Sequence, residues 1–221
     1  MPRASIIIPV REKNPAFLVK KLQMLHTGEF YDFEIIIVDD CSPVFMKSYV
    51  NDFPLVSKVI RLNNPIPYNM GEAKNVGAES ARAKWLAFSD VDVVFTDGSL
   101  KTLVDRADKV EEKVVMGKLC VPNCGTYIAH PAWTYRICCF CLIDRDAFHS
   151  VKGFSTEMAG NYGYDDDFLH YKLIKRFKFK FEGDCLAYMD RLDKGSFDPP
   201  DLSVNYRKYQ DLKAKFDKGE I

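Results

Sequence analysis

Residues 69–92, NMGEAKNVGAESARAKWLAFSDVD, predict a helix followed by a buried strand that ends in two aspartates. Over 69–84, small and apolar residues recur at three- and four-residue spacing on one helical face: Ala73, Val76, Gly77, Ser80 and Ala81. Small side chains let a helix pack closely on a sheet. The strand follows at 85–90, and Asp90 and Asp92 come at its end. Two like charges after an apolar strand require a positively charged partner.

The chain before this stretch alternates strands with helical segments. We expect a helix over 14–25 and three further strands, 5–10 (SIIIPV), 34–40 (EIIIVDD) and 58–62 (KVIRL). This alternation predicts a parallel sheet with crossover helices, in which ligands bind beyond the carboxyl ends of the strands. Charged residues follow three of the strands, namely Arg11-Glu12, Asp39-Asp40 and the pair Asp90 and Asp92. The sequence therefore predicts a charged ligand at this edge.

Length and composition set the broad class of the protein. The chain has 221 residues, of which 47% are hydrophobic, and this is enough for one well-packed domain. Lysine plus arginine and aspartate plus glutamate both number 31, so no overall charge favours nucleic acid as a partner. No apolar run approaches the length of a membrane span, and the N-terminus lacks a long apolar targeting region. We expect a cytoplasmic protein.

The seven cysteines favour a reducing compartment over a disulfide framework, because their number is odd and most lie in apolar runs. Zinc is an alternative for the cluster Cys120, Cys124, Cys138, Cys139 and Cys141. Cys138 and Cys141 stand at the C-x₂-C spacing of zinc sites, but no second C-x₂-C pair accompanies them. Residues 133–143, WTYRICCFCLI, instead predict a buried strand in which cysteine acts as a small hydrophobic residue.

The D-x-D sequence of Asp90 and Asp92 suits a hard divalent cation, which takes oxygen ligands and bridges to phosphate oxygens. Such an ion would help a diphosphate to leave. The alternative is an exposed turn before a helix in 96–107, with Thr96 or Asp97 as its N-cap. A dinucleotide fold is disfavoured, since the first strand is followed by no glycine-rich turn, and the phosphate loop GxxxxGK[ST] is absent.

Four motifs in order resemble the nucleotide-sugar glycosyltransferases of the GT-A fold, most closely the inverting family 2. They are SIIIPVREKN, EIIIVDDCSP, NMGEAKNVGAESARAKWLAFSDVD and VKGFSTEMAGNYGYDDDFLHYKL, and the resemblance covers roughly residues 4–190. The segments FSDVD, AKNVG and GYDDDF also resemble the β-1,4-galactosyltransferases. The resemblance implies an α/β fold, a single Rossmann-like domain with a mixed central sheet flanked by helices.

The resemblance also implies roles on the donor side. Pro9 and Arg11 would line the pocket for the nucleobase. Asp39 would accept hydrogen bonds from the base, and Asp40 would lie near the ribose. The structural alternative is that both aspartates cap a short helix after Pro43.

Two further donor-side roles follow from the resemblance. Lys74 stands where family 2 usually has arginine, and it would face the nucleotide. Its alternative is a solvated helix face. Asp90 would contact the ribose or the donor sugar.

The metal site implied by the resemblance centres on Asp92, which would bind the ion directly beside Asp90. The histidine that often completes the family's site is missing from FEGDCLAYMDRLDKG, residues 181–195. Met189 falls where the β-1,4-galactosyltransferases use a methionine ligand, and Asp190 and Asp193 are nearby oxygen donors. A mixed oxygen and sulfur site fits Mn²⁺ better than Mg²⁺. The alternative for Met189 is a core residue.

The motif GYDDDF, residues 163–168, supplies the acid that the resemblance assigns to acceptor chemistry. Asp166 would be the general base that takes the proton of the acceptor hydroxyl, and Asp165 would bind the acceptor. Adjacent carboxylates repel one another, which raises a pKa and suits a base. The alternative is that three acids at a helix N-terminus only favour the helix dipole.

A helix is expected near the C-terminus, with its apolar residues roughly on one face: Leu202, Tyr206, Tyr209, Leu212 and Phe216. Two interpretations remain. With 172–180, its basic residues could contact an anionic membrane that carries a lipid-linked acceptor. Otherwise the helix docks on the domain, which we favour.

We therefore predict a GT-A domain at 1–195, with a nucleotide-sugar-binding half at 1–95 and an acceptor half at 96–195, and a helical extension at 196–221. The expected reaction is metal-dependent, inverting transfer from a UDP-sugar to a hydroxyl of a glycan, lipid-linked or protein-linked acceptor. A nucleotidyltransferase is one alternative, although the basic, glycine-rich first loop is missing. A non-catalytic sugar-binding module is the other, although it has no physical need for these acids.

Overall fold

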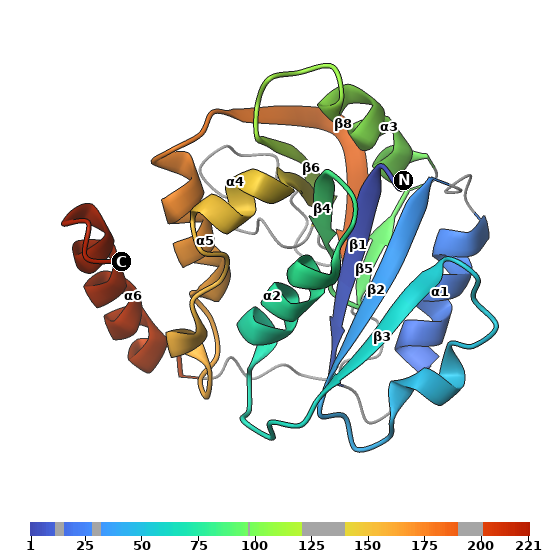
Figure 1. Ribbon diagram of the computed structural model, residues 1–221, viewed down its shortest axis with the longest axis horizontal. Helices are drawn as coiled ribbons and strands as arrows, with labels where there is room; N and C mark the ends of the chain where they lie inside the picture. Colours follow the sequence, from blue (N-terminus) through green and yellow to red (C-terminus); the bar gives the residue numbers. More distant parts are fainter. Residues whose placement is uncertain (12–15, 28–31, 97, 121–139, 190–200) are drawn as a thin grey trace.

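The computed structural model describes residues 1–11, 16–27, 32–96, 98–120, 140–189 and 201–221. One mixed sheet crosses the molecule (Figure 1). Its strands follow the order β3-β2-β1-β4-β7-β6-β8-β5. The strands of its first half are β1 (Ala4–Val10), β2 (Phe33–Asp40), β3 (Val56–Leu62) and β4 (Trp85–Phe88). The other four are β5 (Val93–Phe95), β6 (Val114–Cys120), β7 (Cys141–Asp144) and β8 (Phe179–Met189).

The predicted parallel half is confirmed. β1 pairs in parallel with both β2 and β4, so that Ala4 lies opposite Phe33 on one side and Trp85 on the other. β7 then runs antiparallel to β4 and to β6, and β5 runs antiparallel to β8. The antiparallel pairs make the sheet mixed. In the parallel half, the carboxyl ends of β1, β2 and β4 lie at the same edge of the sheet.

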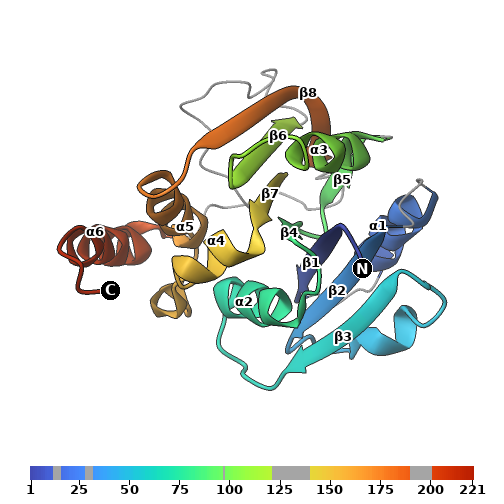
Figure 2. The ribbon, with the colours of Figure 1, turned by 45° about the horizontal axis from the view of Figure 1, so that its top comes forward.

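The alternation of side chains along β1 builds a core on each face of the sheet. Ile6 and Ile8 pack with Leu22 of α1 (Ala16–Thr27) and Leu103 of α3 (Ser99–Ala107). Ile7 points to the opposite core, which contains residues of α2 (Met70–Ser80), α4 (Arg145–Ser150) and α5 (Asp165–Ile174). Figure 2 shows these two layers of helices on either side of the sheet.

The small face predicted for α2 is confirmed by its contact with the sheet. A Cβ atom added at Gly77 would lie 2.4 Å from Cγ2 of Ile7, which is closer than real side chains approach. The helix ends at Ser80, earlier than the predicted residue 84. The reason is that the next amides bond to the sheet: Arg82 N donates to Glu34 Oε1 at 2.7 Å and Ala83 N to Ser5 Oγ at 3.2 Å.

Two other boundaries differ from the prediction. The strand expected at 85–90 ends at Phe88, where the D-x-D turn begins. The following helix, α3, has Gly98 in the left-handed conformation (φ 68°) at its N-cap position. Thr96 is therefore not the cap, and its hydroxyl instead donates to Leu186 O of β8 at 3.0 Å. Asp97 lies outside the described residues.

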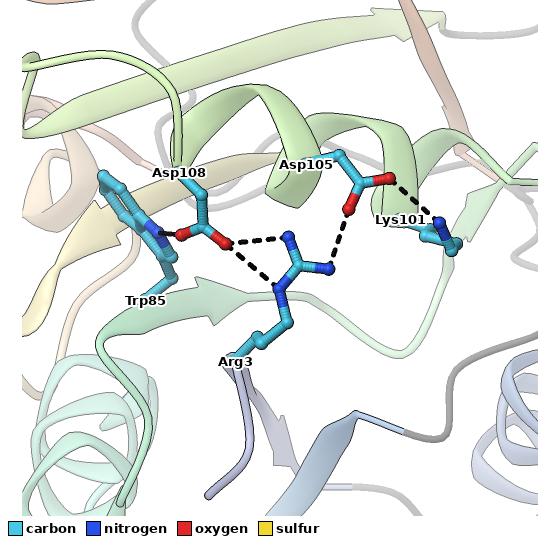
Figure 3. A network of polar contacts seen from close by, with 5 residues as sticks. All are labelled: Arg3, Trp85, Lys101, Asp105 and Asp108. Atoms are coloured by element: carbon cyan, nitrogen blue, oxygen red, sulfur yellow. Dashed lines mark hydrogen bonds and ion pairs between the residues drawn. The ribbon is translucent and has the colours of Figure 1, made fainter.

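A network of paired charges joins the amino ends of β1 and β4 to the end of α3 (Figure 3). Arg3 pairs with Asp105 and with Asp108, each at 2.7 Å. Trp85 Nε1 donates to the second carboxylate at 2.8 Å, and Lys101 pairs with the first at 2.9 Å. Because strands β1 and β4 are parallel, this network lies at the end of the sheet opposite to the predicted ligand edge.

The C-terminal helix α6 (Ser203–Asp217) docks on α5, as favoured from the sequence (Figure 1). Leu212 is buried against Phe168 of α5 and Met158 of the short helix η3 (Thr156–Met158). Leu202 and Tyr206 of the predicted apolar face remain exposed. None of the helices in the described ranges combines the length and apolar character that a membrane span requires. The predicted boundary at residue 195 lies outside the described residues.

Candidate active site

The side chain of Lys74, from α2, joins the two acidic motifs that the sequence singled out. Its Nζ lies 3.2 Å from Asp166 Oδ1 at the start of α5 and 3.8 Å from Asp90 Oδ1 beyond β4. The lysine side chain is only 3% exposed, so the alternative of a solvated helix face is wrong. Its ammonium is one positive partner that the aspartates after the strand require.

A second buried lysine, Lys21, holds the D-x-D turn in place. Lys21 of α1 donates from Nζ to Ser89 Oγ at 2.7 Å and to Val93 O, and it lies 4.7 Å from the ring centre of Phe95. Ser89 and Val93 are the residues on either side of the turn that carries Asp90 and Asp92, which is itself buried. The sequence analysis missed this lysine. Its signal is a position three residues after Leu18 and four before Leu25, on the buried face of the helix.

The carboxylates around Lys74 are held in an environment that disfavours their charge. The pKa of Asp90 is raised, chiefly because the protein removes it from water and further because Asp166 and Asp92 lie near it. Burial and the charge of Asp166 raise the pKa of Asp165 to about 7. Lys74 opposes both shifts. A bound cation would favour the ionised forms of these carboxylates, so their arrangement is compatible with a metal site.

Arg11 and Asp40 occupy the donor side of the same edge. Asp40 is fully buried at the end of β2, and its Oδ2 lies 3.4 Å from Arg11 Nη1. The guanidinium also donates to the carbonyls of Pro65, at 3.0 Å, and Ile66. Asp40 Oδ1 accepts no hydrogen bond from any described residue. Burial raises the pKa of Asp40, and the charge of Arg11 opposes this shift. The contact of Asp40 with a ribose stays a prediction.

Asp39 has its oxygens engaged by the protein itself. Oδ1 accepts from Ser42 N at 2.8 Å, and Oδ2 accepts from Met46 N at 3.2 Å and Arg61 Nη1 at 3.0 Å. Met46 begins the short helix η1 (Met46–Tyr49), so these bonds favour the structural alternative for this residue. Its contact with a nucleobase stays a prediction.

Two further donor-side placements complete this edge. Arg61 was missed from the sequence, although β3 places it directly opposite Asp39. Pro9 is buried on β1 opposite Val38, and its place in a base pocket also stays a prediction.

The acidic motif begins α5, as predicted. Asp165 and Asp166 lie in its first turn, after Gly163 and Tyr164, which both adopt the left-handed conformation (φ 89° and 66°). The aspartates thus favour the helix dipole, and Asp166 in addition pairs with Lys74. The dipole alternative is therefore compatible with a place in the site and does not replace it.

The metal prediction rests on the D-x-D oxygens. Asp90 and Asp92 offer the oxygen ligands that Mn²⁺ and Mg²⁺ accept, and the carboxylate of Asp166 lies near them. In the described part of the chain, no group of three or more histidine, cysteine, aspartate or glutamate side chains is placed to hold a metal ion. The side chain of Met189 lies outside the described residues, as do Asp190 and Asp193.

The zinc alternative finds no support among the described cysteines. Cys141 and Cys185 are buried, and burial raises the pKa of both thiols, that of Cys185 to about 11. Among the described residues, no group of three or more potential ligands is placed around either cysteine to hold a metal ion. Cys124, Cys138, Cys139 and the side chain of Cys120 lie outside the described residues.

Comparisons with known sequences agree on one family. The model for "Glycosyl transferase family 2" matches residues 5–183. The chain is 30% identical over 111 residues to GalNAc(5)-diNAcBac-PP-undecaprenol beta-1,3-glucosyltransferase of Campylobacter jejuni, a match that covers 49% of this chain and 36% of that protein. It is 34% identical over 134 residues to an uncharacterized glycosyltransferase of Haemophilus influenzae, with 58% and 38% covered. The matches thus span little more than a third of these relatives.

Solved structures share the fold at low identity. TarS 1–349 of S. aureus, in complex with UDP-GlcNAc, superposes with a TM-score of 0.72 at 17% identity, over 84% of this chain and 58% of that one. The mannosyltransferase PcManGT of Pyrobaculum calidifontis, in complex with GDP-Man and Mn²⁺, gives 0.68 at 15% identity, over 88% and 58%. The predicted GT-A fold is confirmed, whereas the similarity to β-1,4-galactosyltransferases stays a prediction.

Proposed function

Because the chain belongs to glycosyl transferase family 2, we propose that it transfers a sugar, with inversion, from a UDP-sugar to a hydroxyl group of a glycan, lipid-linked or protein-linked acceptor. One observation carries this proposal. The buried ammonium of Lys74 lies between Asp90 of the D-x-D turn and Asp166 of the acidic motif. The two motifs that the reaction needs are therefore parts of one site.

The donor is proposed to bind at the carboxyl ends of β1, β2 and β4. Arg11 fixes the loop at Pro65 and Ile66, and the unbonded Oδ1 of Asp40 is an acceptor for a ribose hydroxyl. UDP is favoured by the TarS structure, which holds UDP-GlcNAc. PcManGT holds GDP-Man, so the nucleotide must be tested directly.

A divalent cation is proposed to bind to Asp92 and Asp90, with Met189 as a further candidate ligand. Support comes from the oxygen donors, from the neighbouring carboxylate of Asp166 and from the Mn²⁺ in PcManGT. When bound, the ion would neutralise the diphosphate and so make it a better leaving group. Lys21, which holds both sides of the turn, keeps these carboxylates in place.

Asp166 is proposed to be the general base. It takes the proton from the acceptor hydroxyl while that oxygen forms a bond to the anomeric carbon, on the face opposite to the departing diphosphate. The bond between the anomeric carbon and the diphosphate oxygen breaks in the same step. Lys74 Nζ lies 3.2 Å from Asp166 Oδ1 and so holds this carboxylate at the start of α5. Asp165 would hold the acceptor by a hydrogen bond.

The test is a panel of UDP-glucose, UDP-galactose, UDP-GlcNAc and UDP-GalNAc with p-nitrophenyl glycosides as acceptors, each with and without Mn²⁺. We expect UDP release for at least one donor and acceptor pair, and a product whose new bond has the opposite anomeric configuration by NMR. A nucleotidyltransferase would instead release pyrophosphate from UTP and a sugar 1-phosphate. Absence of both donor binding and UDP release across the panel would contradict the proposal.

A further inference from the structure

We propose that the C-terminal helix α6, through Asn205, sets the position of the acidic first turn of α5 and is thereby part of the acceptor side of the active site. The inference rests on the proposed function for the meaning of that turn. It concerns a helix that lies beyond residues 5–183, the range that the family model matches.

The amide group of Asn205 binds the loop that leads into the acidic motif. Its Nδ2 donates to the carbonyl oxygens of Met158, Asn161 and Gly163, at 3.0, 2.9 and 2.8 Å. The side chain is fully buried, and its Oδ1 accepts no hydrogen bond from any described residue. Three carbonyl oxygens around one nitrogen require a donor at this position. The side chain therefore fixes the path of residues 158–163.

The start of α5 is also held by apolar contacts from α6. Gly163 comes so close that a Cβ atom there would lie 2.8 Å from Leu202 Cδ2, next to α6. The ring of Tyr164 stacks on Tyr209, with centroids 5.4 Å apart, and lies 5.5 Å from Tyr206. Tyr164 has a left-handed backbone, which an L-residue adopts only where its surroundings enforce it. Contacts from α6 provide that enforcement.

These contacts bear on the reacting groups because Tyr164 directly precedes Asp165. On its other side the same loop is tied to the segment before α2, where Gly160 N donates to Pro67 O at 2.9 Å. The loop is thus fixed between α6 and the segment that leads to Lys74. If α6 released the loop, the first turn of α5 would lose its support, and the contact between Asp166 and Lys74 would loosen with it.

The competing explanation is that α6 only adds stability. Its opposite end offers a matched control: Asp217 accepts hydrogen bonds from Tyr171 of α5, at 2.6 and 2.8 Å, and pairs with Lys175 at 3.4 Å. Asp217→Asn weakens the docking of the helix far from the loop. A purely stabilising helix would respond alike to changes at both ends.

The test compares Asn205→Asp, which replaces the donor by a carboxylate that repels the three carbonyls, with Asp217→Asn. Three quantities are measured for each variant. They are hydrogen exchange in peptides covering 158–168, the affinity for UDP in the presence of Mn²⁺, and the rate of transfer with the most active donor and glycoside pair of the panel. For Asn205→Asp we expect hydrogen exchange to become at least tenfold faster and kcat to fall at least tenfold. The Kd of UDP should stay within twofold of the wild-type value. For Asp217→Asn we expect the exchange rate and kcat to stay within twofold of the wild-type values.

Equal exchange in the two variants, transfer by Asn205→Asp within twofold of wild type, or a parallel loss of UDP affinity and transfer would each overturn the inference. Should Asn205→Asp fail to fold, Asn205→Ser keeps one donor, and the same criteria apply to it. If the wild type transfers no sugar with any pair, the proposed function fails. The exchange comparison then still decides whether Asn205 holds the loop.

Discussion

Lys74 and Asp166 form an ion pair, with Nζ 3.2 Å from Oδ1, between residues that are 92 positions apart in the chain. The pair joins α2 to α5 across the edge of the sheet where β4 ends. Because the lysine is buried, its charge is poorly screened by water, and it acts on every carboxylate nearby. The ionisation of the acidic motif therefore depends on a residue of the donor side.

Replacing Lys74 by methionine should shift the acidic limb of the pH profile of kcat/KM to higher pH. The lysine lowers the pKa of Asp90 and Asp165, so its removal raises both. At pH 7, we expect transfer to fall by about 10- to 100-fold. Lys74→Arg keeps the charge and should restore most of the activity. A methionine variant with the wild-type pH profile would show that Lys74 has no role in the ionisation of Asp90 and Asp165.

Asp166→Asn should retain the shape of the site and lose the acceptor for the proton. We expect transfer at saturating donor to fall about 100- to 10,000-fold, the usual contribution of a general base. UDP affinity should persist, because the donor groups lie on other strands. Asp165→Asn should cost less in rate. If Asp166→Asn transfers sugar at nearly the wild-type rate, the acidic motif serves only the helix.

Asp165 should make the protein less stable as the pH rises. Its pKa is raised from 3.8 to about 7 in the folded state, so between these values the folded chain binds more protons than the unfolded chain. The free energy of unfolding then decreases from about pH 4 to pH 7 through this group. Asp165→Asn should remove that slope and gain ~1 kcal/mol or more at pH 8. Urea unfolding of both proteins across this range is the measurement, and parallel curves would count against the shift.

Asp92→Ala should abolish the effect of Mn²⁺ on nucleotide binding. In the wild type we expect the ion to tighten UDP binding by about tenfold or more, because Asp90 and Asp92 would hold it and it would offset the charge of the diphosphate. Calorimetry with UDP, with and without Mn²⁺, measures the difference. Asp105→Ala, at the opposite end of the sheet, is the control and should behave as wild type. An unchanged Mn²⁺ effect in Asp92→Ala would place the ion elsewhere.

Gly77→Ala should destabilise the fold although alanine is the better helix former. The added methyl group would meet Ile7 Cγ2 at 2.4 Å, so α2 must move away from the sheet. We expect a loss of about 1–3 kcal/mol in the free energy of unfolding. Glu79→Ala, at an exposed position of the same helix, should be nearly neutral. A Gly77→Ala protein as stable as wild type would mean that the helix tolerates the displacement.

The parallel half of the fold could be predicted because its signals are local. Apolar runs such as 34–40 and the small face around Gly77 show both the type of each element and its buried side. The antiparallel half could not, because nothing in the residues of β5 specifies β8 as its partner. The end of α2 was also wrong, since bonds to Glu34 and Ser5 come from distant parts of the chain.

The candidate site followed the same division. The aspartates were found because charged residues at strand ends form a visible pattern. Lys21, Arg61 and Asn205 were missed because each is a polar residue whose partner is defined only by the folded chain. A lysine on an apolar helical face was a usable signal. For an asparagine within a polar helix there was none.

The placement of β5 has a consequence for how the chain folds. Residues 93–95 are the last residues of the predicted donor half, 1–95. Their strand is nevertheless hydrogen-bonded to β8, at the far edge of the sheet beyond β7 and β6. β4 in turn joins β1 to β7 through backbone bonds on both of its sides. If the chain were cut after residue 95, β5 would belong to the first fragment and its partner β8 to the second. The predicted donor and acceptor halves therefore share one hydrogen-bonded sheet, and we expect the described sheet to unfold as one unit.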